Sequence, residues 1–251
     1  MIKIKKKNRV LLGLLVIILI ISAGLAVWLL NPYQATEYAV ELMHRTTRDV
    51  KITDQGWIVF KPADHEIATG FIFYPGARVQ AEAYTPLAYH LAGAGYQVIL
   101  VPMPANLAIL GSNKADQVLA TYQEIDNWVI GGHSLGGVMA ARYAKNNPAR
   151  ISGLILLASY PAESDDLSAS NLDVLSIYAT EDGHATIDQI KQSKDLLPED
   201  TGWVEIKGGN HSQFGYYGFQ TGDEQATISR AEQQQQIFSA IDQFLITITE
   251  K

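Results

Sequence analysis

A serine flanked by glycines is the part of the sequence best suited to chemistry. Ser134 lies in the segment GGHSLGG, residues 131–137, which fits the pattern Gly-x-Ser-x-Gly. A short apolar run at 128–131 precedes it, and a stretch of helix-forming composition at 136–146 follows it. In the order strand, turn and helix, this pattern is typical of a nucleophile elbow, a strained turn that exposes the serine oxygen. We therefore predict that Ser134 is a nucleophile.

A serine hydroxyl is a weak nucleophile at neutral pH, so it needs a histidine base that a carboxylate orients. Asp182 follows a predicted strand at 173–179, and His211 follows a predicted strand at 203–207. The chain order serine, acid, histidine is one of the known orders of such a triad. Because parallel strands end at the same edge of a sheet, we expect these two side chains to lie near Ser134.

Other residues compete for both roles. Glu181 and Asp188 are alternative acids, and Asp182 could instead cap a helix. Asp182 is preferred because it heads its loop and precedes the permissive Gly183. The remaining histidines are expected to be ordinary surface or core residues; they are His44, His65, His90, His133 and His184.

The tetrahedral intermediate of acyl transfer carries an oxyanion, which two backbone N–H groups can stabilise. Leu135, directly after the nucleophile, is the first predicted donor. The second is expected in the loop at 75–78, after a predicted strand at 70–74; proline has no N–H, and Ala77 is favoured over Arg78. The Arg78 side chain could instead bind a substrate carboxylate, with a structural salt bridge as the alternative.

Strand and helix patterns alternate along the chain, which predicts an α/β fold with a mostly parallel sheet covered by helices on both faces. A hairpin of 49–53 and 57–60 is expected first. The other predicted strands are 70–74, 97–101, 128–131, 151–158, 173–179 and 203–207. The predicted helices are 84–95, 114–123, 136–146, 187–196 and a C-terminal helix with its glutamines 233–236 on the polar side.

The N-terminus predicts a membrane anchor. Residues 10–30 contain no charge and follow five cations, and 21 residues can cross the ~30 Å hydrocarbon core of a bilayer. The cations place residues 1–9 in the cytoplasm and the rest of the chain outside, as a single-pass protein. A cleaved signal peptide followed by secretion is the alternative, but the length of the segment and Trp28 favour an uncleaved anchor. We expect a spacer at 31–48 and one catalytic domain at 49–251.

Composition excludes several kinds of site and partner. The 251 residues include no cysteine, which excludes disulfides and thiolate metal sites. After residue 30 the chain has 14 basic and 26 acidic residues, a net charge of −12, so no nucleic-acid partner is expected. The histidines lack ligand spacing and no dinucleotide or phosphate-binding glycine pattern occurs, so neither a metal nor another cofactor is predicted.

Several segments together carry a family resemblance: FYPGARV at 73–79, VPMPANLAIL at 101–110, GGHSLGGVMAARYA at 131–144, SIYATEDG at 176–183 and GGNHSQFGYYG at 208–218. From about residue 57 onward the chain resembles bacterial membrane-anchored or exported α/β-hydrolases of the dienelactone-hydrolase-like group, whose serine members are carboxylesterase-like. The resemblance implies an α/β-hydrolase fold with Ser134 as nucleophile, Asp182 as acid and His211 as base. Dienelactone hydrolases proper use cysteine at the elbow, so their substrate is not expected here. The usual His-Gly before the oxyanion loop is replaced by Pro75-Gly76.

The sequence thus predicts a serine hydrolase that cleaves a small-molecule or lipid-like ester through an acyl-enzyme. An envelope acyltransferase could use the same triad, with an alcohol in place of water in the second step. A non-catalytic, membrane-tethered scaffold is the remaining alternative, because a fold alone does not prove activity. The complete set of serine, acid and histidine argues against it.

Overall fold

The computed structural model describes residues 6–45, 49–63 and 67–250. The chain divides into two compact units, Met1–Pro32 and Tyr33–Lys251. Part of the predicted basic stub, residues 1–5, and His65 lie outside the described residues.

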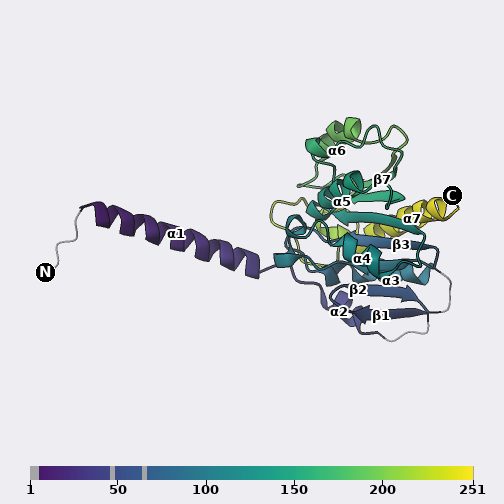
Figure 1. The fold of residues 1–251 in the computed structure, drawn as a ribbon, viewed down its shortest axis with the longest axis horizontal. Coiled ribbons are helices and arrows are strands. Elements are labelled where there is room, and N and C mark those ends of the chain that lie inside the picture. The colour runs from purple at the N-terminus through teal and green to yellow at the C-terminus, as the bar shows by residue number, and fades with distance from the viewer. Residues whose placement is uncertain (1–5, 46–48, 64–66, 251) are drawn as a thin grey trace. The chain divides into compact units, whose positions relative to one another are not determined.

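In the described part of the first unit, the one regular element is the long helix α1, Lys6–Leu30 (Figure 1). Its segment Leu11–Leu30 has a mean hydropathy of 2.8, and it is long and apolar enough to cross a membrane. A signal sequence near the N-terminus can meet the same criteria of length and hydropathy, so the uncleaved anchor stays a prediction.

The second unit is built on one eight-stranded sheet with the order β1-β2-β4-β3-β5-β6-β7-β8. The strands from β4 to β8 in this order are parallel, whereas β1 and β2 pair antiparallel with their neighbours. The predicted fold class and the predicted hairpin are thereby confirmed. The strands are β1 Val50–Asp54, β2 Ile58–Pro62, β3 Thr69–Tyr74, β4 Gln97–Leu100, β5 Asn127–His133, β6 Gly153–Leu157, β7 Asp173–Ala179 and β8 Gly202–Ile206.

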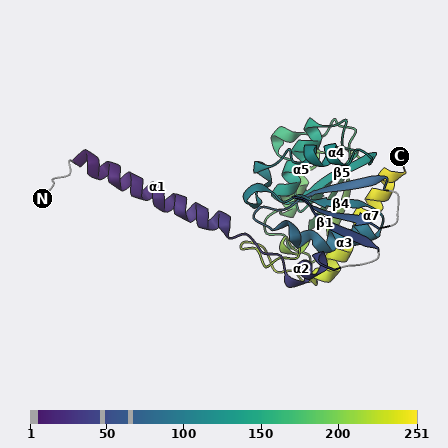
Figure 2. The same ribbon diagram turned by 60° about the horizontal axis from the view of Figure 1, so that its bottom comes forward.

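Helices cover both faces of this sheet (Figure 2). Residues of α3, α6 and α7 belong to the hydrophobic cluster on one face, and residues of α4 and α5 belong to the cluster on the other. The helices are α2 Glu37–Met43, α3 Thr85–Gly93, α4 Ala115–Thr121, α5 Leu135–Asn146, α6 Ile187–Gln192 and α7 Arg230–Thr249, with short 3-10 turns that include η1 Ala81–Tyr84, η2 Pro104–Asn106 and η3 Ala108–Leu110.

The side chains of β3 show how one strand serves both layers. Phe71 and Phe73 belong to the cluster under α3 and α7, whereas Ile72 and Tyr74 belong to the cluster under α5. Successive side chains of a strand point to opposite faces, and both faces are covered here. This explains why the central strands read as continuous apolar runs instead of alternating polar and apolar residues.

The parallel strands all end at one edge of the sheet, which we call the carboxyl edge. The loops that follow β3, β5, β7 and β8 meet there, and they carry the residues that the sequence marks for chemistry. Residues 33–36 reach the same edge, because Tyr33 forms a bridge with Val79 and Ala35 forms a bridge with Tyr217. Thr36 then caps α2 by accepting a hydrogen bond from the Ala39 N–H.

Candidate active site

Ser134 joins β5 to α5 in a strained backbone conformation, with φ 52° and ψ −124°. Non-glycine residues rarely adopt a positive φ, and such strain persists only where the surrounding structure enforces it. The flanking glycines permit it. A Cβ atom on Gly136 would overlap the carbonyl oxygens of Tyr74 and Pro75, and one on Gly132 would overlap the backbone of Gly136.

Neighbouring groups hold this turn in place. The Ser134 N–H donates to the Leu157 carbonyl at 3.0 Å, and the Ser159 hydroxyl donates to the Ser134 carbonyl at 2.7 Å. Leu135 is the first residue of α5, so its N–H has no acceptor within the helix. The N-terminus of a helix favours negative charge, and here it lies directly beside the serine.

Asp182 and His211 form a buried pair. His211 Nδ1 lies 2.8 Å from Asp182 Oδ2, and both side chains are shielded from solvent. The other carboxylate oxygen, Oδ1, accepts hydrogen bonds from the backbone N–H groups of His184 and Ala185 at 2.8 and 2.7 Å. The carboxylate therefore has three donors, and it fixes the orientation of the imidazole ring.

The two alternative acids lie elsewhere. Glu181 accepts a hydrogen bond from the Thr180 hydroxyl at 2.9 Å, and Asp188 lies in the first turn of α6. The structure pairs only Asp182 with His211 among these three carboxylates, within the residues it describes.

A cavity of about 210 Å³ brings Ser134 and His211 together. Its lining also includes Leu135, Val138, Ala158, Ser159, Tyr160, His184 and Ala185. Among the described residues, His211 Nε2 has no hydrogen-bond partner, which leaves this nitrogen available to a substrate or to the serine. Catalytic hydrogen bonds are often long in free enzymes and shorten only when substrate binds.

The loop after β3 lies against the elbow, and two of its N–H groups already have acceptors. The Arg78 N–H donates to the Asn106 carbonyl at 2.7 Å, and the Gly76 N–H donates to the Tyr84 hydroxyl at 3.0 Å. Ala77 thus stays the candidate for the second oxyanion donor. The Arg78 guanidinium lies 5.3 Å from the centre of the Tyr33 ring, a cation–π contact.

His133, the residue before the serine, is part of this site although the sequence marked it as an ordinary histidine. It is fully buried, its ring centre lies 4.4 Å from that of His211, and it stacks on Phe214 at 5.6 Å. Its Nδ1 lies 2.9 Å from the Tyr84 hydroxyl. Burial holds the pKa of His133 well below its usual value, and the neighbouring His211 and His184 lower it further. His133 is therefore neutral near pH 7.

His184 also contacts the pair. Its ring centre lies 4.9 Å from that of His211, and it lines the cavity. Nothing in the sequence sets these two histidines apart, because their contact with His211 depends on how three separate loops converge.

Asp223 is a third residue of this site that the sequence did not single out. Its buried carboxylate accepts hydrogen bonds from the N–H groups of Gly183 and His211, both at 3.2 Å, and from the N–H and hydroxyl of Ser212 at 2.7 and 2.6 Å. It therefore joins the loop of Asp182 to the loop of His211. The one feature of the sequence that could have pointed to Asp223 is the polar segment QTGDE at 220–224, which matches no strand or helix pattern.

The glutamines at the start of α7 correct one expectation. The prediction that 233–236 form only a polar face is wrong, because Gln233 and Gln234 are buried. Gln233 Oε1 accepts from the Asn210 N–H at 3.0 Å, and its Nε2 donates to the Asn210 carbonyl at 2.8 Å. The Gln233 side-chain amide thus bonds both backbone groups of Asn210, the residue that precedes His211.

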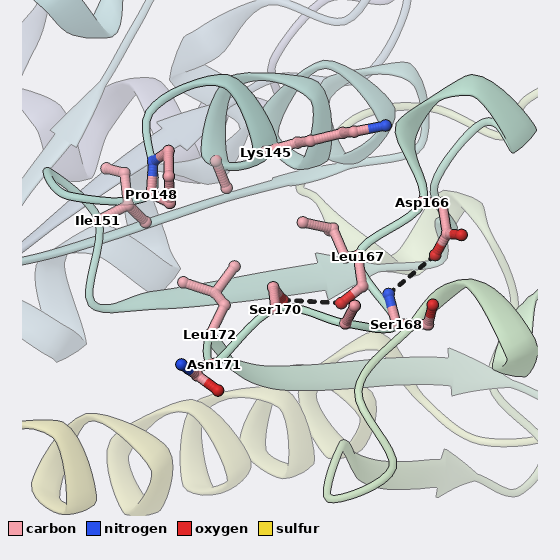
Figure 3. A pocket seen from close by; sticks show the side chains of 11 residues that line it. Lys145, Pro148, Ile151, Asp166, Leu167, Ser168, Ser170, Asn171 and Leu172 are labelled. Carbon is pink, nitrogen blue, oxygen red and sulfur yellow. Dashed lines mark hydrogen bonds between the residues drawn. The ribbon is translucent and has the colours of Figure 1, made fainter.

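A larger cavity of about 510 Å³ lies away from this site, between the C-terminal end of α5 and the segment before β7 (Figure 3). Two of its polar groups are bonded locally: the Ser168 N–H donates to Asp166 at 2.8 Å and the Ser170 hydroxyl donates to the Leu167 carbonyl at 2.7 Å. None of the predicted triad residues lines it. Within the described ranges, no group of three side chains is arranged to hold a metal ion.

Comparisons with known proteins agree with this architecture. The model of the Alpha/beta hydrolase family matches residues 70–235. A comparison with curated proteins gave no match.

Solved structures with the same fold include three hydrolases. A predicted CIB-like hydrolase from Thermoplasma acidophilum is 14% identical, with a TM-score of 0.58 over 77% of this chain and 97% of its own. A monoacylglycerol lipase from Paleococcus ferrophilus is 15% identical, with a TM-score of 0.53 over 71% and 94%. A soluble variant of monoglyceride lipase from Saccharomyces cerevisiae is 10% identical, with a TM-score of 0.55 over 82% and 96%. At these identities the likeness is one of fold.

Proposed function

The chain belongs to the alpha/beta hydrolase family, and from this premise we propose that it is a serine hydrolase that cleaves a carboxylic ester through an acyl-enzyme. One observation carries the proposal. His211, which the buried Asp182 orients, lines the same cavity as Ser134 on its strained turn, and among the described residues His211 Nε2 has no hydrogen-bond partner. This combination supplies a nucleophile, a base and a group that orients the base.

The proposed reaction has two steps. The Ser134 hydroxyl oxygen attacks the ester carbonyl while His211 Nε2 takes its proton, and Asp182 stabilises the imidazolium that forms. The backbone N–H groups of Leu135 and Ala77 bind the oxyanion. His211 returns the proton to the leaving alcohol. A water molecule then attacks the acyl group, again with His211 as base, and Ser134 is regenerated.

The proposed substrate is a small-molecule or lipid-like ester. Two of the similar solved structures are described as monoacylglycerol or monoglyceride lipases, which supports this class. The cavity walls include Leu135, Val138, Ala158 and Ala185, so an apolar acyl group finds apolar contacts there.

The proposed location is the outer face of the cell membrane. Residues 10–30 would form a single-pass anchor, with the basic residues 1–9 in the cytoplasm and the hydrolase domain outside. Protease added to intact cells should then remove the domain. Mass spectrometry of the membrane-bound protein should recover the intact chain of 27.6 kDa. A chain that begins after the apolar segment would instead indicate a cleaved signal peptide.

A fluorophosphonate probe tests the nucleophile. The wild-type chain should be labelled, and Ser134→Ala should abolish the labelling and reduce ester turnover by about 10⁴-fold or more. Ser168→Ala is the matched control, because Ser168 is an exposed serine beside the remote cavity. Labelling that persists in Ser134→Ala would exclude Ser134 as the nucleophile.

A series of p-nitrophenyl esters from acetyl to palmitoyl then measures the acyl preference. Labelling without hydrolysis of any ester would favour acyl transfer to an alcohol on the same triad. The absence of both labelling and turnover would favour a non-catalytic scaffold.

A further inference from the structure

The chain enters the second unit beside the candidate site. The Tyr33 N–H donates to the Arg78 carbonyl at 2.6 Å, and the Gln80 N–H donates to the Tyr33 carbonyl at 3.1 Å. The Thr36 N–H donates to the Tyr216 carbonyl at 2.8 Å. Residues 33–36, which we call the strap, are therefore fixed between the loop that carries Ala77 and the loop that follows His211.

Exposed apolar side chains gather around this strap. Ile109 and Leu110 are 55% and 60% exposed on η3, a few residues after Asn106, whose carbonyl accepts the Arg78 N–H. Phe219 is 48% exposed, two residues after the Tyr217 that bridges to the strap.

The helix that follows the strap adds two more exposed apolar residues. The large apolar residues exposed in the described part of the second unit are Tyr38, Val40, Ile109, Leu110, Phe219 and Ile246. Single exposed apolar residues are common on soluble domains. Here all of them except Ile246, which lies on α7, belong to α2 or to loops at the carboxyl edge. Such a concentration marks an interaction surface.

The length of the connection limits where this surface can be. Leu30 ends α1 and Tyr33 begins the second unit. Three Cα–Cα steps of ~3.8 Å allow at most about 11 Å between them. The polar region of one bilayer leaflet is ~5–8 Å thick. If α1 spans a bilayer, the strap must therefore lie at or just above the membrane surface, whatever the tilt of the domain.

We propose that the strap-side surface, made of Tyr38, Val40, Ile109, Leu110 and Phe219, docks on the lipid bilayer that holds α1. The cavity of Ser134 lies at the same carboxyl edge, so docking turns the site toward the membrane. The substrate is then an amphiphilic ester taken from the bilayer. This last point rests on the proposed hydrolase function, whereas the docking itself rests only on the proposed membrane anchor.

Apolar contact, not charge, drives this docking. The chain after residue 30 carries a net charge of −12, so anionic lipids would repel it. Few side chains suffice because the tether already keeps the domain at a high effective concentration near the surface.

The absence of cysteine from the chain makes a site-specific test direct. Leu110→Cys and Phe219→Cys are labelled with an environment-sensitive fluorophore in the full chain, reconstituted into phosphatidylcholine vesicles. Asp126→Cys is the matched control, since Asp126 is exposed just before β5 at the opposite edge of the sheet. We expect a blue-shifted emission and quenching by brominated acyl chains at 110 and 219, but neither at 126.

Two results would overturn the docking. One is the same emission and quenching at all three positions. The other is a blue shift that grows with the ratio of protein to lipid, which would indicate that a second copy of the chain covers this surface.

A second measurement tests the source of the substrate. The double variant Leu110→Ser/Phe219→Ser should hydrolyse a vesicle-embedded ester about tenfold more slowly, equivalent to ~1.4 kcal/mol, with unchanged turnover of soluble p-nitrophenyl acetate. Ile246→Ser should leave both rates unchanged. Equal rates on the embedded ester for the double variant and the wild type would exclude delivery from the membrane. A wild type that cleaves neither ester would refute the hydrolase function, and the fluorescence result would still decide the docking.

Discussion

The strained backbone conformation of Ser134 depends on close packing between Gly136 and the end of β3. Ser134 has a positive φ and its side chain lines the cavity, and only glycine fits at 136, against the carbonyl oxygens of Tyr74 and Pro75. Gly136→Ala should therefore reduce stability by about 2–4 kcal/mol and abolish fluorophosphonate labelling, since β3 and the elbow would have to move apart. Urea unfolding and probe labelling measure the two effects.

Gly93→Ala is the control for this substitution. Gly93 is the last residue of α3, and an added Cβ meets no atom within 4 Å. Unfolding should show a change of about 0 to +1 kcal/mol in stability, with normal labelling. Equal effects of the two substitutions would show that the close contact at Gly136 does not hold the elbow.

Asp223 positions the histidine without touching the reacting atoms. Asp223→Asn replaces one carboxylate oxygen by an NH₂ group, which faces the donors of Ser212 or His211. The loss of these hydrogen bonds loosens the His211 loop, and a displacement of about 1 Å can lower a rate about 100-fold. We expect kcat to fall by about one to two orders of magnitude, with KM nearly unchanged, because the acyl contacts stay in place.

Asp166→Asn tests whether this effect is specific. Asp166 is an exposed aspartate that accepts a loop N–H from Ser168 beside the remote cavity. Its substitution should leave kcat and KM unchanged. A rise in KM at constant kcat for Asp223→Asn would contradict a positioning role.

At the scale of elements, the Tyr84 hydroxyl on η1 connects the loop after β3, which carries Ala77, to His133 at the elbow. The Tyr84 hydroxyl accepts the Gly76 N–H and lies next to His133 Nδ1, and all three groups are buried. Tyr84→Phe leaves two buried polar groups without partners, which costs ~1–3 kcal/mol for each group. Because the Ala77 N–H follows Gly76 directly, we also expect kcat to fall about tenfold or more as the oxyanion donor loses its place.

Tyr143→Phe separates stability from catalysis. The Tyr143 hydroxyl donates to Asp116 at 2.8 Å, on the face of α5 away from the candidate site. This variant should lose ~1 kcal/mol of stability and keep its kcat. The same kcat for Tyr84→Phe and the wild type would show that the hydroxyl serves only stability.

The elements themselves could be predicted because their signals are local. The apolar runs of β3 and β5 and the glycine-bounded serine need only neighbouring residues to be recognised. Gln233 and His133 could not be placed in this way. The partner of Gln233 lies 23 residues away at Asn210. The partners of His133 are Tyr84 on η1 and, in the loop after β8, His211 and Phe214. The role of a buried polar side chain depends on its hydrogen-bond partners, and these are brought together only when the chain has folded.

At the scale of the whole molecule, the chain enters the second unit at the same edge of the sheet that carries the candidate active site. The strap of residues 33–36 lies within what the sequence marked as a spacer, yet it pairs with the oxyanion loop and with the loop after His211. If residues 10–30 form the proposed membrane anchor, a tether fixed at this place would keep the carboxyl edge near the membrane. The proposed location and the orientation of the site then depend on the same short connection.

The stability of the whole domain should depend on pH through His133. Burial keeps its pKa in the folded state well below the 6.5 of the unfolded chain, so below pH 6.5 the unfolded state binds a proton that the folded state does not. The stabilisation is fully present above that pH, and it is lost as the pH falls, by about 1.4 kcal/mol per pH unit. The titratable groups that face His133 are Tyr84, His184, His211 and Tyr217, and they are retained in His133→Gln.

The difference between the wild type and His133→Gln isolates this contribution. Free energies of unfolding measured from pH 7.5 to pH 5 should fall more steeply for the wild type, with the extra slope confined to pH values below about 6.5. His90, whose pKa burial also lowers, is present in both proteins and cancels from the comparison. Parallel curves would mean that His133 is protonated in the folded protein as readily as in the unfolded chain. His133 would then not be the neutral neighbour of His211 that its burial implies.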